Sequence, residues 1–303
     1  MPREMPAISL VAVPGRRRAT IEAAKEIDQR GFAGIWSPSI FSNMALCEAL
    51  ALETKSIPFA TSIAPIYMRT VGDFAQSAAF IHEVSAGRFR LGVGVSHAPA
   101  HVRMGVTPGK PLADMRSFVE RYRTSEGLGT LPPVVLAALR TQMVRLAGEI
   151  GDGVVFANAA RSHMGASLSA LSEAKRKDTA FSIANMIPTC ISDDIEAAKA
   201  VNRRTLTSYG MLPNYRNYWK EAGYVEEMEA IENAIAEGRK EDVPKCFSDK
   251  WLADTTLFGP RSKVIEGVEA WRAAGVRTPI VVPSSAAGNQ MQAIAEVVAA
   301  FTA

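Results

Sequence analysis

The sequence has little of what marks several common classes of protein. It has only three cysteines, Cys47, Cys190 and Cys246, which are far apart and form no CxxC pair. This argues against a disulfide framework and a zinc site, and favours a reducing compartment such as the cytoplasm. The apolar run at 8–13 is too short to span a membrane. It precedes its arginines, the reverse of a signal peptide, so no membrane attachment is expected.

Strong charge is also missing. The formal net charge of the 303 residues is +3, and no basic run is interleaved with aromatic residues. The short basic triplets at 16–18 and 175–177 are typical of solvated surface, so nucleic acid is excluded as a partner. With 48% hydrophobic and 21% charged residues, the chain is typical of a globular protein with a sizeable core. Its length fits one (β/α)8 barrel with an insertion, or two domains.

The clearest local pattern runs from Ile57 to Val95. An apolar strand at 57–63 ends at Ala64-Pro65. A helix follows, with apolar residues at helical spacing between Phe74 and Val84, and a Gly-Arg turn leads into a strand at 89–95. A crossover of this length joins two parallel neighbours in one sheet.

The same alternation of strand and helix continues along the chain, which predicts an α/β fold with a parallel sheet. The segment from 98 to 111 carries several prolines and glycines and is expected to be an irregular loop, whereas 162–175 is expected to be one helix. Strands are predicted at 7–13, 34–36, 57–63, 89–95, 134–137, 153–156, within 181–191, and at 279–282. Eight strands with no GxGxxG after the first favour a (β/α)8 TIM barrel over a Rossmann sheet, as a single domain over 1–303.

Residues 209–257 break this alternation with crowded aromatics and a charged helical run. We interpret the segment as an insertion before the last strand. It is a lid over substrate, a dimer contact, or a small hydrophobic core of its own, which is the most common outcome. Tyr215 and Trp219 are its candidates for a pocket wall.

Two blocks of the sequence together carry a family resemblance. The first contains Thr61–Pro65, Arg69, Ser85–Phe89 and Leu91–Gly94, and the second is Pro133–Asn158. They resemble the bacterial luciferase-like superfamily. The resemblance is strongest to oxidoreductases that depend on a flavin or on the deazaflavin coenzyme F420. Both blocks stand in family order, and the rest of the chain fits the same fold nearly end to end.

In such a barrel the active site lies at the carboxyl ends of the strands. His97, just past the strand at 89–95, is therefore a catalytic candidate that titrates near neutrality. Arg88 begins that strand and is interpreted as a structural, ion-pairing residue. Gly92 and Gly94 fit equally well a close approach of ligand or a crowded interior.

The resemblance also implies a cofactor site. Deazaflavin-dependent members carry a non-proline cis peptide where this chain has Ser62-Ile63, which bulges against the cofactor ring. They bind the cofactor phosphate at the turn that is Ala137–Thr141 here, commonly with glycine where this chain has Arg140. We therefore expect the cofactor to contact Ser62, Ile63, Ala64, Gly94, Ser96, His97, Ala137, Ala138, Leu139, Arg140, Thr141, Asn158 and Ala159.

Relatives often carry an acid or histidine after the second strand for proton handling, whereas this chain has Ser37-Pro38-Ser39. Ser39 is the catalytic candidate at that position. No paired carboxylates, Ser-His-Asp set or metal-spaced cluster replaces the missing acid, and no metal is expected. Hydride transfer needs a bound cofactor and a well-placed substrate carbon rather than a side-chain nucleophile.

The sequence thus predicts an F420-dependent oxidoreductase that transfers a hydride to or from a small organic substrate. One alternative is a flavin mononucleotide (FMN)-dependent monooxygenase, and a second is a non-catalytic flavin-binding homologue. A homodimer is expected, because the helices near 43–55 and 71–84 carry small apolar residues and luciferase-like proteins often pair through that side.

Overall fold

The computed structural model describes residues 4–40 and 42–302, which form two compact units. The first unit contains the chain up to Phe156 together with Ala170–Ala184. The second contains Ala157–Ser169 and the chain from Asn185 onward. The predicted alternation of strands and helices is present in both.

The strands of the first unit are parallel and follow the order β1-β2-β3-β5-β6-β7. In the register of these strands, Ile35 of β2 pairs with Phe59 of β3, and Val93 of β5 pairs with Leu136 of β6. The strands are β1 (Ala7–Ser9), β2 (Gly34–Ser37), β3 (Phe59–Thr61), β4 (Ala64–Pro65), β5 (Phe89–Gly94), β6 (Val134–Ala137) and β7 (Gly153–Ala157). The two-residue β4 pairs with the end of β5. The Ser62-Ile63 step thus separates two short strands that lie beside β5.

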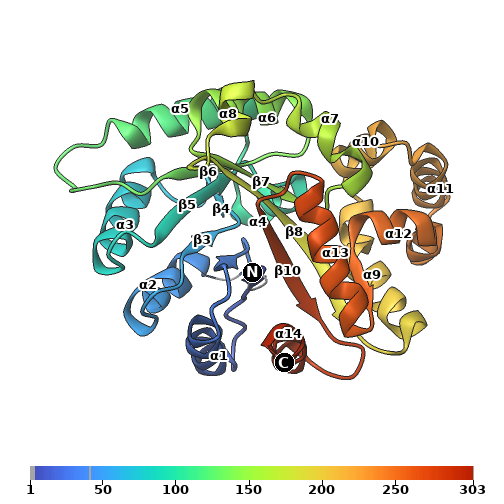
Figure 1. Cartoon of the computed structure of the whole chain (residues 1–303). Helices are drawn as coiled ribbons and strands as arrows, with labels where there is room; N and C mark the ends of the chain where they lie inside the picture. The colour runs from blue at the N-terminus through green and yellow to red at the C-terminus, as the bar shows by residue number, and fades with distance from the viewer. Residues whose placement is uncertain (1–3, 41, 303) are drawn as a thin grey trace. The chain divides into compact units, whose positions relative to one another are not determined.

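The helices of the first unit pack in chain order, α1 on α2, α2 on α3, α3 on α5, and α5 on α6. Figure 1 shows α2 and α3 outside the strands β3 and β5. They are α1 (Arg17–Gln29), α2 (Asn43–Glu53), α3 (Val71–Val84), α4 (Ala98–Met104), α5 (Pro111–Arg123), α6 (Thr141–Ile150) and α8 (Glu173–Lys177). Helix α3 starts where the Thr70 hydroxyl accepts from the Asp73 N–H at 3.2 Å.

The second unit holds the long strand β8, which pairs with both β9 and β10. Its strands are β8 (Ser182–Ile191, whose first three residues belong to the first unit), β9 (Leu257–Gly259) and β10 (Thr278–Ser284). Its helices are η1 (Arg161–His163), α7 (Met164–Leu168), α9 (Ile195–Gly210), α10 (Pro213–Glu221), α11 (Val225–Ala236), η2 (Lys240–Cys246), α12 (Asp249–Thr255), α13 (Arg261–Ala273) and α14 (Gln290–Thr302).

The segment 209–257 has a hydrophobic core of its own. Its helices α10, α11 and α12 lie together in Figure 1. Trp219 and Trp251 cross edge to face at 4.8 Å, and Trp251 stacks on Phe247 at 4.2 Å. Tyr215 packs against Trp219 at 5.4 Å. The aromatic crowding in the sequence therefore reflects a packed cluster.

Three predictions of local structure were wrong. Residues 98–104 form helix α4, because Pro99 stands in the first turn, where its missing N–H costs nothing, and Gly105 supplies the left-handed cap at φ 66°. The single helix expected at 162–175 is divided into η1, α7 and α8, and α8 begins at the Ser172 cap. Strand β9 was not predicted.

Arg88 is structural, as predicted, but its partners are carbonyl oxygens. Its guanidinium donates to the carbonyls of Ala51, Thr54, Ile57 and Ser85 at 2.9–3.0 Å, and to the Thr54 hydroxyl at 2.7 Å. No carboxylate of the described residues forms an ion pair with it. One side chain thus joins the end of α2 to the starts of β3 and β5.

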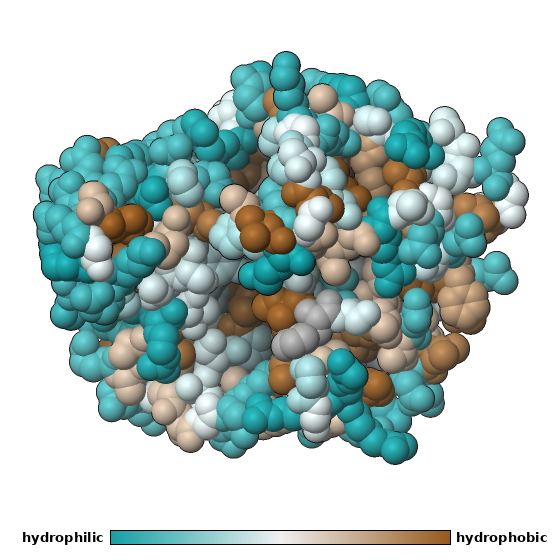
Figure 2. Space-filling view, turned by 180° about the vertical axis from the view of Figure 1, so that it is seen from behind, coloured by the Kyte–Doolittle hydropathy of each residue, from teal (hydrophilic) through white to brown (hydrophobic). Residues whose placement is uncertain are grey.

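The surface is mainly hydrophilic, with hydrophobic residues scattered over it, as Figure 2 shows for one face. Within residues 4–40 and 42–302, no helix is long and apolar enough to cross a membrane.

Candidate functional site

In the first unit, the loops that follow β2 and β3 are tied together at their strand ends. The Ser62 N–H donates to the Ser37 carbonyl at 2.7 Å. Asn43, the first residue of α2, donates its side-chain amide to the Ile63 carbonyl at 3.1 Å and to the Ser37 carbonyl at 3.4 Å. The Ser62-Ile63 peptide bond is cis, as expected from the resemblance. Asn43 was not predicted from the sequence.

The two glycines of β5, Gly92 and Gly94, lie in a crowded interior, which is one of the two explanations that the sequence allowed. A Cβ at Gly92 would lie 1.8 Å from the Thr61 carbonyl oxygen, and a Cβ at Gly94 would lie 2.8 Å from Ile63 Cγ1. Thr61 also donates its hydroxyl to the Gly92 carbonyl at 2.6 Å. Both glycines are therefore required because other parts of the chain pack directly against them. At Gly94 the space that a Cβ would fill is taken by the Ile63 side chain.

The chain leaves β5 through a left-handed residue, Ser96, at φ 63°. Such a conformation is unusual for serine and is found preferentially at functional sites. The residue before it, Val95, is held by His101 of α4, whose Nε2 donates to the Val95 carbonyl at 2.6 Å. Burial, and the nearby His101 imidazole, lower the pKa of His97. His97 is therefore neutral at neutral pH.

A second set of contacts fixes the segment after α4. The Asp114 carboxylate accepts from the Tyr67 hydroxyl at 2.6 Å and from the Gly109 N–H at 2.8 Å. The Tyr67 ring meets the His101 ring edge to face at 5.4 Å. These contacts join the segment after β4 to α4 and to the start of α5.

In the turn between β6 and α6, only some of the backbone N–H groups are available to bind an anion. The Ala138 N–H already donates to the Val155 carbonyl at 3.1 Å, which removes it as a phosphate donor. At the start of α6, the N–H groups of Thr141 and Gln142 meet no acceptor among the described residues. They are open to an anion at the positive end of the helix. Leu139 is half-buried, and the side chain of Arg140 is exposed one position before the helix.

In the second unit, the turn after β7 is held by the segment 209–257. Asn158 is left-handed at φ 56° and 3% exposed. Its N–H donates to the Met186 carbonyl at 3.0 Å, and its carbonyl accepts from Trp219 Nε1 at 3.0 Å. The Ala160 N–H donates to the Tyr218 hydroxyl at 3.1 Å, and burial raises the pKa of Tyr218 to about 12, so that hydroxyl stays neutral.

Asp254 also binds this turn, through Ser162. Its carboxylate accepts from the Ser162 N–H at 2.9 Å, from the Ser162 hydroxyl at 2.6 Å and from the Tyr224 hydroxyl at 2.8 Å. The contacts together fix the backbone from Asn158 to Ser162. Those made by the segment 209–257 come from residues 58 positions or more further along the chain, and sequence spacing gives no signal of them.

Several buried polar atoms near the strand ends have no hydrogen-bond partner among the described residues. In the first unit they include the hydroxyls of Ser9 and Ser62, and in the second the side-chain amide nitrogen of Asn185. The Asn158 side chain hydrogen-bonds the Tyr209 hydroxyl. Buried polar groups are almost always paired, so each such atom calls for an explanation. Asn185 was not singled out in the sequence.

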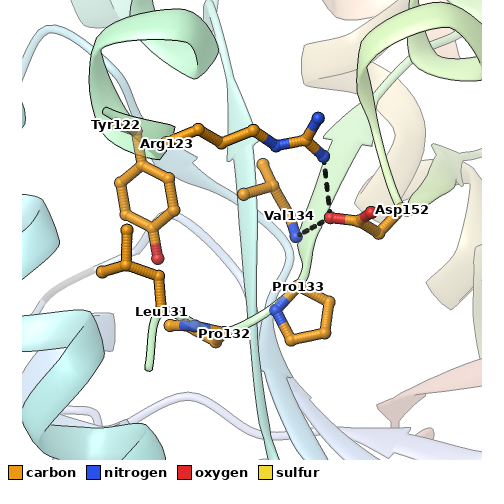
Figure 3. Close-up of a pocket in the computed structure, with 7 residues that line it drawn as sticks. All are labelled: Tyr122, Arg123, Leu131, Pro132, Pro133, Val134 and Asp152. Carbon is orange, nitrogen blue, oxygen red and sulfur yellow. Dashed lines mark hydrogen bonds and ion pairs between the residues drawn. The ribbon is translucent and has the colours of Figure 1, made fainter. Parts of the chain in front are cut away.

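One open pocket of about 420 Å³ lies at the amino-terminal end of β6, away from the carboxyl ends of the strands described above. It is lined by Tyr122, Arg123, Leu131, Pro132, Pro133, Val134 and Asp152. Figure 3 shows the Asp152 carboxylate between Arg123 and the Val134 N–H, which it contacts at 3.0 Å and 2.8 Å. Val134 begins β6, so this pocket belongs to the amino-terminal edge, where a barrel of this type carries stability rather than catalysis.

The fold is shared with solved structures. A coenzyme F420-dependent tetrahydromethanopterin reductase from Methanopyrus kandleri matches over 98% of both chains, with a TM-score of 0.78 and 18% sequence identity. This likeness shows that the chain has the closed (β/α)8-barrel fold, as predicted. The class is thus that of the TIM-barrel proteins.

The chain belongs to the luciferase-like monooxygenase family, whose model matches residues 8–278. A 5,10-methylenetetrahydromethanopterin reductase from Archaeoglobus fulgidus is 26% identical over 89% of this chain and 90% of its own length. A putative coenzyme F420-dependent oxidoreductase from Mycobacterium tuberculosis is 27% identical over 91% of this chain and 93% of its own. The family and these relatives make the chain an oxidoreductase by class.

Within the first unit, the structure brings together the predicted residues Ser62, Ile63, Gly94 and Ala137. Ile63 and Ala137 both contact the position above Gly94. Ala64 of β4 pairs with Val93 of β5, and Ala159 lies buried in the second unit beside Asn185. Ser39 is exposed on the loop after β2, and its catalytic role stays a prediction.

Proposed function

We propose that this protein is a coenzyme F420-dependent oxidoreductase that transfers a hydride between the deazaflavin and a small organic substrate. The observation that carries the proposal is at the carboxyl ends of β3 and β5. There the Ser62 hydroxyl is buried without a partner, and the side chain of the next residue, Ile63, lies over Gly94, as Ala137 also does. The names of the two relatives and of the solved neighbour support the choice of cofactor.

The residues present fit such a group. A ring cofactor offers one apolar face and a few polar edges, which suit an apolar side chain flanked by an unpartnered donor. Its phosphate needs backbone N–H groups, and those of Thr141 and Gln142 at the start of α6 are open. The Arg140 guanidinium stands where relatives commonly have glycine, and it can add a charge-assisted bond to phosphate.

The deazaflavin supplies the carbon that gives or receives the hydride. The chain binds and orients the ring and places the substrate carbon within transfer distance. His97, neutral at neutral pH, can hold a proton at one ring nitrogen and offer a lone pair at the other. Ser39 is an exposed hydroxyl, so we assign it no more than a contact with substrate.

The test is a fluorescence titration of the purified full chain with coenzyme F420 and, in parallel, with FMN. Binding of F420 at micromolar concentration or tighter, with FMN at least tenfold weaker, is the expected result. Preference for FMN would transfer the protein to the monooxygenase alternative. Tight F420 binding without turnover of any hydride acceptor would favour the non-catalytic homologue.

We also propose that the chain forms a homodimer through α2 and α3. Large hydrophobic side chains are exposed on both helices, with Leu52 67%, Phe80 56% and Val84 41% exposed. Ala45 on α2 is small and exposed, which permits close approach of a second helix. Light scattering should give twice the chain mass for the wild-type protein and the single mass for Phe80→Glu. A wild-type monomer would overturn this pairing.

A further inference from the structure

The backbone carbonyls on both sides of the left-handed Ser96 accept hydrogen bonds from one residue, His101. Its Nε2 donates to the Val95 carbonyl at 2.6 Å, and its backbone N–H donates to the His97 carbonyl at 3.0 Å. A left-handed serine is unfavourable on its own and persists where its surroundings enforce it. His101 supplies that constraint from α4.

Helix α4, which carries His101, is not held by a hydrophobic core. None of its seven residues, all within the described part of the chain, is buried. The His101 ring instead contacts the Val95 carbonyl and the ring of Tyr67, which it meets edge to face at 5.4 Å. The Tyr67 hydroxyl donates in turn to Asp114 at 2.6 Å. The imidazole therefore has a fixed place, and it ties α4 to the end of β5.

The bond to Val95 defines what the side chain at position 101 must offer. A backbone carbonyl can only accept, so Nε2 of His101 carries the proton. A glutamine side chain can offer an amide N–H at a similar reach from the backbone, whereas leucine offers no donor. The two replacements therefore separate the hydrogen bond from the bulk of the side chain.

The same contacts act on His97. It stands between Ser96 and the first residue of α4, so its backbone is fixed from both sides. Burial, and the charge of the nearby His101 imidazole, lower the pKa of His97. On the other side of His101, burial and the bond to Asp114 raise the pKa of Tyr67, so that phenol stays neutral. Displacement of α4 should thus change both the position and the titration of His97.

We propose that His101 is a positioning residue, which holds the end of β5 so that His97 faces the bound cofactor. His101 acts through His97 and does not itself touch the ligand. The contact between His97 and a cofactor rests on the proposed function. The tie between α4 and the end of β5 rests on contacts within the first unit alone.

The experiment uses the full chain with His101→Leu, His101→Gln or His97→Gln, and with His101→Leu and His97→Gln combined. Because α4 has no buried residue, these changes should leave the chain folded. Arg103→Leu is the matched control, because Arg103 is exposed on the same helix. Dissociation constants are measured for F420 and FMN. In the cofactor-free chain, NMR follows the titration of His97, whose signals are assigned among the four histidines by their loss in His97→Gln.

We expect His101→Leu to weaken binding of the preferred cofactor about fivefold, and His101→Gln to stay within about twofold of the wild type. In the His97→Gln background, His101→Leu should have no further effect, because a residue that acts only through His97 has nothing left to position. Arg103→Leu should bind as the wild type does.

The titration gives a second result that does not depend on a ligand. In His101→Leu the pKa of His97 should rise toward the ordinary 6.5, because α4 loosens and the neighbouring charge is lost. In His101→Gln it should stay below that value, because burial is the larger cause of the lowering and is kept.

The proposal is overturned if His101→Leu binds like the wild type, if it weakens binding equally with and without His97, or if His101→Gln loses as much affinity as His101→Leu. A wild-type preference for FMN overturns the proposed function alone, because the same four proteins are then compared with FMN. A wild-type chain that binds neither compound also overturns the proposed function. The titration then decides the role of His101, and an unchanged pKa of His97 in His101→Leu overturns it.

Discussion

The indole Nε1 of Trp219 donates a hydrogen bond of 3.0 Å to the backbone carbonyl of Asn158. Trp219 is fully buried on α10, and Asn158 is the left-handed residue that ends β7. The bond connects the inserted segment to a strand-end turn that the family resemblance assigns to the cofactor. We infer that the insertion supports this turn, in addition to forming a core of its own.

Trp219→Phe should therefore lower both stability and cofactor affinity, because the buried Asn158 carbonyl loses its donor. The matched control is Trp251→Phe, in which the indole Nε1 has no partner among the described residues. Both changes remove similar volume from one cluster. Urea unfolding should show Trp219→Phe about 1–2 kcal/mol less stable than Trp251→Phe. Equal losses in the two variants, with equal cofactor affinity, would contradict a supporting role.

The two glycines of β5 should respond differently to substitution by alanine, because Gly92 is needed for folding whereas Gly94 is needed to position Ile63. In Gly92→Ala the new Cβ would meet the Thr61 carbonyl oxygen at 1.8 Å, which only a backbone shift relieves, so little folded protein is expected. In Gly94→Ala the obstacles are the Ile63 side chain at 2.8 Å and Ala137 Cβ at 3.0 Å.

Gly94→Ala should fold with a loss of about 1–3 kcal/mol and bind the cofactor roughly tenfold more weakly, because Ile63 is displaced. Gly72→Ala on α3, where nothing lies within 4 Å of the new Cβ, is the control and should change neither property. Thermal melting and cofactor titration measure both. Wild-type affinity in Gly94→Ala would show that the position of Ile63 does not matter for binding.

The lowered pKa of His97 predicts a pH dependence of stability. Burial favours the neutral imidazole in the folded state, so the unfolded chain takes up this proton at a higher pH than the folded chain does. The stabilising contribution is complete above the ordinary pKa of 6.5 and is lost as the pH falls through the lower folded-state value.

His97→Gln should accordingly lose less stability than the wild type between pH 7 and pH 5. The measurement is the free energy of unfolding in urea at several pH values in this range. The same variant should lose turnover if His97 contacts cofactor or substrate. If the unfolding free energies of the wild type and His97→Gln change in parallel with pH, His97 has the same pKa in the folded and unfolded states. Full turnover in His97→Gln would remove His97 from the site.

The sequence predicts the parts of this molecule that depend on local pattern and on short parallel crossovers. The strand-helix-strand unit around Phe89 has a clear period and a single short connection, and its helix and second strand are present as predicted. The first strand, predicted at 57–63, is shorter and is followed after Ser62-Ile63 by the separate strand β4. Helix α4 was missed, because Pro99 and Gly105 look like breakers until their places in the first turn and the cap are known. The hydrogen bonds of Trp219 and Asp254 to the turn after β7 join distant segments, which no period in the sequence encodes.

The last prediction concerns Arg140, the departure from the family pattern in the turn before α6. If its guanidinium helps to hold the cofactor phosphate, Arg140→Ala should weaken F420 binding severalfold at low salt, and the difference should shrink as salt screens the charge. Arg145→Ala is the matched control, because Arg145 is exposed on the same helix and contacts Gln142 at 3.1 Å. Titrations from about 20 to 500 mM salt measure the effect. An unchanged dissociation constant across that series would remove Arg140 from the site and leave the phosphate to the N–H groups of Thr141 and Gln142 alone.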